Sequence, residues 1–127
     1  MKILLIEDDD LMIRMYQRVL TFKGYTVEIA ENGLLGYEKA KTFKPNLILL
    51  DIMMPVLNGL QTLEKLKQDP ATKDIKVIIL SNLVHKRDSE YAVKLGAIKY
   101  LIKSDYDPNE VIEEINKCLI DVAEVVV

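Results

Sequence analysis

The most constraining feature of this sequence is an unbroken run of four bulky apolar residues, Leu47 to Leu50, which ends in one carboxylate, Asp51. So short an apolar run, followed closely by Pro55, is typical of a strand that is buried on both faces. Strands of this kind form parallel sheets covered by helices, and ligands bind such sheets at the carboxyl ends of the strands. Taken alone, Asp51 could equally cap a turn, so its role depends on the other strands.

The rest of the chain predicts strands and helices in strict alternation. Besides residues 47–50, apolar-rich strands are expected at residues 2–6, 25–30, 75–80 and 97–102. Each strand is followed by a segment with helical periodicity, and Asp107-Pro108-Asn109-Glu110 begins the last helix with a capping box. Five strands joined by short helical crossovers predict an α/β fold, with a five-stranded parallel sheet between two helical layers.

The composition limits the functions that this chain can have. Its 127 residues carry a net charge of −3 without a basic block, so binding to nucleic acid through phosphate contacts is not expected. No apolar run approaches the roughly 20 residues of a membrane span. The single Cys118 excludes an internal disulfide and fits a reducing cytoplasm. We therefore predict one cytoplasmic domain over residues 1–127, without a membrane contact.

The last helix is expected to present a buried face to the sheet. Cys118 is predicted to be a small core residue of this helix. The periodic apolar residues of that face are Val111, Ile115, Leu119 and Val122.

Polar side chains follow four of the five predicted strands. Glu7 and Asp8 come directly after residues 2–6, and Asp51 comes after residues 47–50. Ser81 follows the fourth strand and Lys103 follows the fifth. Because the carboxyl ends of parallel strands meet at one edge of the sheet, these five side chains are expected to converge. The second strand delivers no such residue, which fits a peripheral position.

The chemistry of this cluster follows from its charges. Clustered carboxylates repel one another unless one is protonated or a cation lies among them, and oxygen ligands without His or Cys favour Mg²⁺. A carboxylate beside Mg²⁺ is suited to phosphoryl transfer. Asp51 is then the expected nucleophile, the pair Glu7 and Asp8 holds the metal, and Lys103 and Ser81 bind the other phosphoryl oxygens. The competing interpretation is a surface ion-pair cluster, which would contribute only about 0–1 kcal/mol to stability.

Four motifs give the chain a resemblance to a known family. They are Ile6-Glu7-Asp8, Leu50-Asp51-Ile52-Met53-Met54-Pro55 with Asn58-Gly59, Leu80-Ser81, and Tyr100-Leu101-Ile102-Lys103. Each motif is weak alone, but in this order and at this spacing they resemble the receiver domains of response regulators in two-component signal transduction, including chemotaxis-type stand-alone receivers. The resemblance covers residues 2 to about 122. It implies a doubly wound, flavodoxin-like (βα)5 sandwich of three layers, with the strand order 2-1-3-4-5.

The resemblance also implies a role for each residue of the metal and phosphate site. Asp51 would accept a phosphoryl group from a sensor histidine kinase or a phosphotransfer protein, with Lys103 assisting. Mg²⁺ would be bound by Asp8 and Asp51, by Glu7 through water, and by the backbone carbonyl of Met53.

A switch is implied as well. Ser81 would bond the phosphoryl group and move inward, and Tyr100 would turn inward with it. The surface formed by the fourth helix, the fifth strand and the fifth helix would then change its preference for an unknown downstream protein. The chain would be a signalling switch that catalyses only its own phosphorylation and dephosphorylation, as a monomer or a phosphorylation-dependent dimer.

Some positions depart from the usual family pattern. Asn82 stands where a small residue is common, and its bulk is expected to restrict access to the phosphoryl group or the range of partners. Lys103 is followed by Ser104 where the family usually has Pro, so a rearranged loop is expected over residues 104–106. Met53 and Leu83 are apolar at positions that could otherwise orient an attacking water, which predicts a long-lived aspartyl-phosphate. His85 is predicted to be a solvated residue of the fourth helix.

Two alternatives stay open at this stage. The chain could be a receiver-fold binding module that acts without phosphorylation. It could also be the receiver fragment of a longer regulator or of a hybrid kinase.

Overall fold

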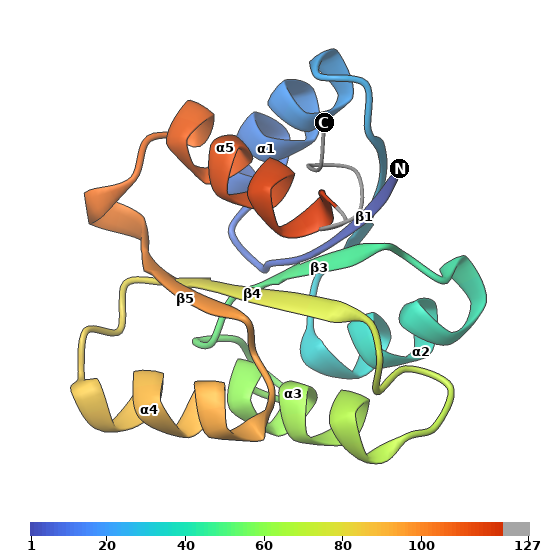
Figure 1. The fold of residues 1–127 in the computed structure, drawn as a ribbon, viewed down its shortest axis with the longest axis vertical. Coiled ribbons are helices and arrows are strands. Elements are labelled where there is room, and N and C mark those ends of the chain that lie inside the picture. Colours follow the sequence, from blue (N-terminus) through green and yellow to red (C-terminus); the bar gives the residue numbers. More distant parts are fainter. Residues whose placement is uncertain (121–127) are drawn as a thin grey trace.

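The computed structural model, which describes residues 1–120, contains a five-stranded parallel sheet with helices on both faces (Figure 1). The strands are β1 (Lys2–Ile6), β2 (Thr26–Ala30), β3 (Leu47–Leu50), β4 (Lys76–Ser81) and β5 (Lys99–Ile102). Their order in the sheet is β2-β1-β3-β4-β5. The predicted doubly wound α/β fold with strand order 2-1-3-4-5 is therefore confirmed.

Five α-helices connect and follow the strands in the described part of the chain. They are α1 (Asp10–Phe22), α2 (Gly33–Phe43), α3 (Gly59–Gln68), α4 (Lys86–Leu95) and α5 (Pro108–Leu119). Figure 1 shows α1 and α5 on one face of the sheet and α2, α3 and α4 on the other. None of the helices within residues 1–120 has the length and apolar character needed to cross a membrane.

The central strand β3 explains why the sheet needs two helical layers. All four of its side chains are fully buried. Because side chains alternate along a strand, Leu47 and Leu49 pack in the core beneath α1 and α5, whereas Ile48 and Leu50 pack beneath α2, α3 and α4. An all-apolar strand of this length is stable only where both of its faces are covered.

Some boundaries differ from those predicted. β4 ends with Ser81, which pairs with β5, so Ser81 is the last residue of its strand and not the first residue after it. A serine hydroxyl does not prevent the backbone from continuing the ladder. β5 begins at Lys99 because the amide of Ala97 still closes the end of α4 by donating to Ala92. His85 is exposed as predicted, but it precedes α4 as its N-cap residue.

The segment that follows β5, for which the sequence predicts a rearranged loop, forms a single turn of 3₁₀-helix over Lys103–Asp105, with a trans peptide bond after Lys103. On α5, Val111 and Ile115 are buried as predicted, while Cys118 and Leu119 are half-buried against the same core. The prediction for Val122 lies outside the described residues.

Candidate functional site

The register of β1 and β3 brings the acidic residues together. Ile6 pairs with Leu50, and the Asp51 amide donates to the Ile6 carbonyl at 3.0 Å, so Glu7 and Asp51 leave the sheet side by side. The carboxylates of Glu7, Asp8 and Asp51 each offer an oxygen within 4.8 Å of the other two. Two strands far apart in the sequence thus deliver their acids to one point, as the sequence predicts.

Asp51 lies at the base of this pocket. It is only 6% exposed, and its Oδ1 accepts a hydrogen bond of 2.9 Å from the amide of Ile52. That bond orients the carboxylate and leaves its second oxygen available. A buried, oriented carboxylate suits attack on an electrophile better than a mobile surface acid does.

Lys103 is the cation of the site. Its Nζ donates to Glu7 Oε1 at 2.7 Å and lies 3.6 Å from Asp51 Oδ1. Burial opposes the charge of this ammonium, but the hydrogen bond to Glu7 and the charge of Asp51 outweigh it and raise the pKa of Lys103. Lys103 therefore stays protonated and holds the two buried acids in place.

Glu7 is a buried acid that also organises the loop after β1. Its Oε2 accepts from the amides of Asp8 and Asp9 at 3.0 and 3.3 Å. Burial raises the pKa of Glu7, with Lys103 opposing and Asp51 adding to the shift. Desolvation also raises the pKa of Asp8, and the neighbouring Glu7 adds to that shift. Three carboxylates thus face a single ammonium, and an additional cation would relieve their repulsion.

The donor set fits Mg²⁺. It consists of carboxylate oxygens from two strand ends, and Asp8 at the rim is exposed to solvent. Hard oxygen ligands in small number, with room for water, are what Mg²⁺ prefers. Met53 follows in the exposed loop after β3, and its role as a carbonyl ligand stays a prediction.

Ser81 and Tyr100 are connected through one backbone segment. Ser81 is fully buried at the end of β4, and its Oγ accepts from the Leu83 amide at 3.2 Å. The hydroxyl of Tyr100, on β5, donates to the Leu83 carbonyl at 2.6 Å. Burial raises the pKa of this hydroxyl, so it remains a donor. Leu83, whose apolar side chain predicts only poor positioning of water, therefore links the two predicted switch residues through its backbone.

Gly59 has a site role that the sequence analysis missed. A Cβ at this position would lie 2.2 Å from the carbonyl oxygen of Asp51 and 2.6 Å from the Cα of Ile52. Only glycine lets α3 begin so close to the end of β3. The glycine of the Asn58-Gly59 motif was the available signal, but nothing local in the sequence shows what it contacts.

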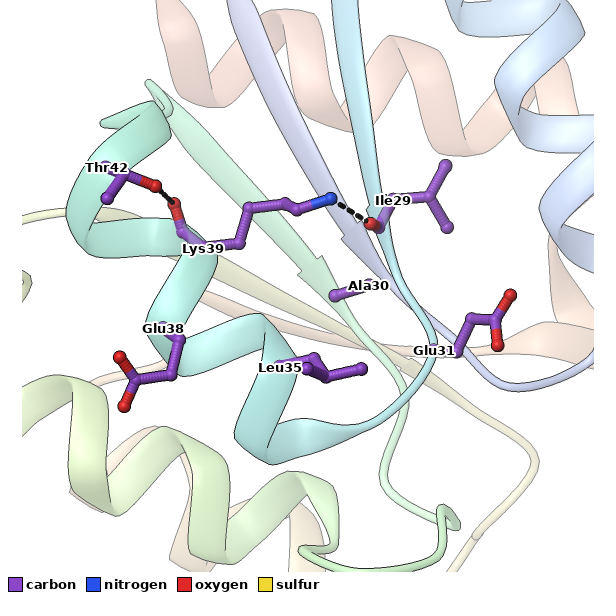
Figure 2. A pocket seen from close by; sticks show the side chains of 7 residues that line it. All are labelled: Ile29, Ala30, Glu31, Leu35, Glu38, Lys39 and Thr42. Atoms are coloured by element: carbon purple, nitrogen blue, oxygen red, sulfur yellow. Dashed lines mark hydrogen bonds between the residues drawn. The ribbon is translucent and has the colours of Figure 1, made fainter.

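A groove between β2 and α2 lies apart from these residues (Figure 2). The Nζ of Lys39 donates to the Ile29 carbonyl at 2.8 Å across this groove, and Thr42 Oγ1 donates to the carbonyl of Lys39. Because β2 is an edge strand, Lys39 blocks one of the backbone groups through which another chain could pair. The groove contains none of the predicted site residues.

The fold and the pocket define the class of the protein. It is a doubly wound α/β protein whose acidic, lysine-bridged pocket lies at the carboxyl edge of the sheet, where β1 and β3 lead to helices on opposite faces. The chain belongs to the response regulator receiver domain family, whose model matches residues 3–116. It is therefore a receiver domain of two-component systems, a family that in general binds Mg²⁺ at an acidic pocket and interacts with histidine kinases or phosphotransfer partners.

Known proteins of several organisms are similar to this chain. The probable transcriptional regulator ycf29 of Pyropia yezoensis is 36% identical over 118 residues, which are 93% of this chain and 53% of that protein. The nitrate/nitrite response regulator protein NarL of Escherichia coli is 36% identical over 117 residues, 90% of this chain and 53% of NarL. The chain thus spans about half the length of these relatives.

Solved structures show the same fold. The crystal structure of a CheY-like response regulator receiver domain protein from Methanospirillum hungatei JF-1 is 30% identical, with a TM-score of 0.84, and the match covers 93% of this chain and 92% of that one. The receiver domain of the Francisella response regulator 1452 is 26% identical, also with a TM-score of 0.84, over 93% of this chain and 95% of that chain.

Proposed function

We propose that Asp51 accepts a phosphoryl group from a phosphohistidine on a sensor histidine kinase or a phosphotransfer protein. One observation carries this proposal. Asp51 is a buried carboxylate that lies 3.6 Å from the Lys103 ammonium and beside the carboxylates of Glu7 and Asp8. Stability alone is a poor reason to concentrate like charges in this way.

The transfer is a displacement at phosphorus. A carboxylate oxygen of Asp51 attacks the phosphorus, the P–N bond to the donor histidine breaks, and the electron pair leaves with the imidazole nitrogen. The Lys103 ammonium and the Ser81 hydroxyl bind phosphoryl oxygens. Glu7, Asp8, Asp51 and the Met53 carbonyl would hold Mg²⁺, which when bound supplies positive charge against the phosphoryl oxygens.

The output follows from the link between Ser81 and Tyr100. If Ser81 moves to bond the phosphoryl group, the Leu83 amide that donates to its hydroxyl moves too, and Tyr100 is bonded to the carbonyl of the same residue. The neighbouring surface of α4, β5 and α5 carries exposed apolar side chains, including Tyr91 and Val93 on α4. We infer that a downstream protein reads this surface. The chain would then be a signalling switch whose chemistry is confined to its own phosphate.

The lengths of the relatives bear on how a receiver domain of this kind acts. The ycf29 and NarL proteins are each about twice as long as the region they share with this chain, since the match covers 53% of each. A receiver that controls an attached or separate regulatory partner is consistent with this, and the partner surface on α4, β5 and α5 would serve either arrangement.

The lifetime of the aspartyl-phosphate is a further part of the proposal. The side chain of Met53 is apolar and exposed at the rim, and Leu83 is apolar and half-buried. Neither can orient a water for attack on the phosphoryl group. We expect a lifetime well beyond seconds in the purified protein with Mg²⁺, measured by loss of the adduct over time, and a half-life of seconds would contradict this.

Acetyl phosphate with Mg²⁺, followed by intact mass measurement, tests the phosphoacceptor. Wild-type protein should gain one phosphoryl adduct, Asp51→Asn should gain none, and Asp74→Asn, at an exposed acid on the α3–β4 connection, should behave as wild type. A wild-type chain that takes no phosphate from acetyl phosphate or from a phosphohistidine donor would favour the binding module that acts without phosphorylation.

A further inference from the structure

The loop between β3 and α3 contains a strained turn close to the phosphoacceptor. Val56 has a φ of 71°, and the Leu57 amide donates to the Pro55 carbonyl at 2.8 Å around it. A bond from residue i+2 to residue i around a positive φ is a γ-turn of the rare hand, and a β-branched residue is a poor occupant of that region. Backbone strain of this kind persists only where surrounding contacts impose it.

One end of the loop is fixed by the end of β3. Ile52 is buried, and its carbonyl accepts from the amides of Met54 and Gly59 at 3.1 and 2.8 Å. These two hydrogen bonds hold the loop against the end of β3. The exposed residues between Ile52 and Leu57 include Met53, the predicted carbonyl ligand of the metal.

The other end is held by two residues outside the loop. A Cβ on Gly33, the first residue of α2, would lie 2.4 Å from the Leu57 carbonyl oxygen and 1.9 Å from Thr62 Oγ1. Thr62 is fully buried on α3, and its Oγ1 donates to the Asn58 carbonyl at 2.8 Å. The start of α2 thus packs directly on the backbone of the loop, at a distance that admits only glycine.

We propose that Gly33 and Thr62 are positioning residues, which brace the β3–α3 loop so that Met53 is held in place for the metal. The inference rests on the proposed Mg²⁺ site. Neither residue belongs to the acidic pocket, and they act through the backbone of Leu57 and Asn58. A larger residue at position 33 must displace backbone, because the Leu57 carbonyl is not the end of a flexible side chain.

Gly33→Ala is the direct test, with Ala40→Gly as its matched control. Ala40 is a buried residue of the same helix, so its replacement lowers stability. Mg²⁺ binding is measured by titration calorimetry on the whole chain, and exchange of the Met54 and Gly59 amides is measured by NMR without metal. We expect Gly33→Ala to weaken Mg²⁺ binding by roughly 10-fold and to speed exchange of both amides. Ala40→Gly should leave the Mg²⁺ affinity unchanged, and it should speed exchange of the two amides no more than its loss of overall stability explains.

A second pair of variants keeps the test valid if Gly33→Ala does not fold. Thr62→Val removes the hydroxyl that donates to Asn58, and Thr62→Ser retains it. Thr62→Val should weaken Mg²⁺ binding in the same direction as Gly33→Ala, and Thr62→Ser should restore it.

The outcomes separate this inference from the proposed function. Wild-type binding of Mg²⁺ together with unchanged binding in Gly33→Ala or Thr62→Val would overturn the brace and leave the phosphoacceptor site intact. Loop amides that exchange as in wild type would overturn it as well, without reference to the metal. A wild-type chain that binds no Mg²⁺ would instead contradict the proposed Mg²⁺ site, on which this inference depends.

Discussion

Replacing Val56 by asparagine should stabilise the protein. Val56 adopts a φ of 71° and is 74% exposed, so it accepts an unfavourable backbone conformation and buries little apolar surface in return. Strained positions of this kind cost about 1–3 kcal/mol. Asparagine visits positive φ far more readily than a β-branched residue does.

The expected gain in stability follows from the backbone strain at Val56 and from the little apolar surface that its side chain buries. Relief of the strain should outweigh the small loss of apolar burial, which gives a net stabilisation of about 1 kcal/mol by Val56→Asn. Val56→Gly relieves the same strain but adds freedom to the unfolded chain, which offsets about 0.5–1 kcal/mol of the gain. The asparagine variant should therefore be the most stable of the three proteins, and a gain of this size would raise Tm by roughly 3–6 °C.

Urea unfolding followed by far-UV circular dichroism, without Mg²⁺, measures this effect. The midpoint should rise while the m-value stays the same, because the surface exposed on unfolding is unchanged. Val84→Asn is the matched control. Val84 is 68% exposed in the loop after β4, and its φ is not positive, so its replacement should be nearly neutral. A Val56→Asn variant no more stable than wild type, beside a neutral control, would refute the argument from strain.

Three further predictions concern the metal, the lysine and a buried hydroxyl. Free Mg²⁺ at ten times its dissociation constant should raise the free energy of unfolding by about 1.4 kcal/mol. Excess EDTA should remove this gain, and the Asp8→Asn variant should lack most of it. Equal urea midpoints with and without Mg²⁺ would disprove the metal site. The folded chain holds the Lys103 proton more tightly than the unfolded chain, so its contribution is complete below the ordinary pKa of 10.5 and is lost as the pH rises past the raised pKa. Relative to Lys103→Arg, wild type should then lose stability only above that pH, and parallel profiles would exclude this role. Thr72→Val removes a buried hydroxyl that donates to the Leu66 carbonyl at 2.7 Å and should cost about 0.5–1.5 kcal/mol, whereas the exposed Thr42→Val should cost less; equal urea midpoints for the two variants would be evidence against it.

The fold could be predicted because its main determinants are local and repeat along the chain. An all-apolar β3 requires two covering layers, and the capping residues of α5 mark its start without any tertiary information. The errors lie where tertiary contacts decide a boundary. Ser81 continues β4 because β5 offers it a partner, and the start of β5 is delayed because Ala97 still bonds to the end of α4.

The acidic pocket could also be predicted, since the topology of a parallel sheet places Glu7, Asp51 and Lys103 at one edge. The brace on the β3–α3 loop could not. Gly33 and Leu57 are far apart in the sequence, and a glycine that begins a helix has no feature that reveals a contact with a distant carbonyl. Val56 is more misleading still, because a β-branched residue favours extended backbone and its neighbours impose a positive φ instead.

The acidic pocket is continuous with the hydrophobic core, and this explains why the carboxylates of Glu7 and Asp51 cannot move apart. Ile6 and Leu50 are fully buried and paired in register, one residue before Glu7 and Asp51. To separate the two carboxylates, β1 and β3 would have to move apart and expose the side chains of Ile6 and Leu50. Exposing a buried side chain of this size costs about 1.5–3 kcal/mol. Repulsion between the acids is smaller than this in a pocket that already holds the Lys103 ammonium. The repulsion therefore persists in the folded state, where only a proton or a cation can relieve it. Because the rigid core keeps the carboxylates close together, it strengthens the binding of a positive charge at this site.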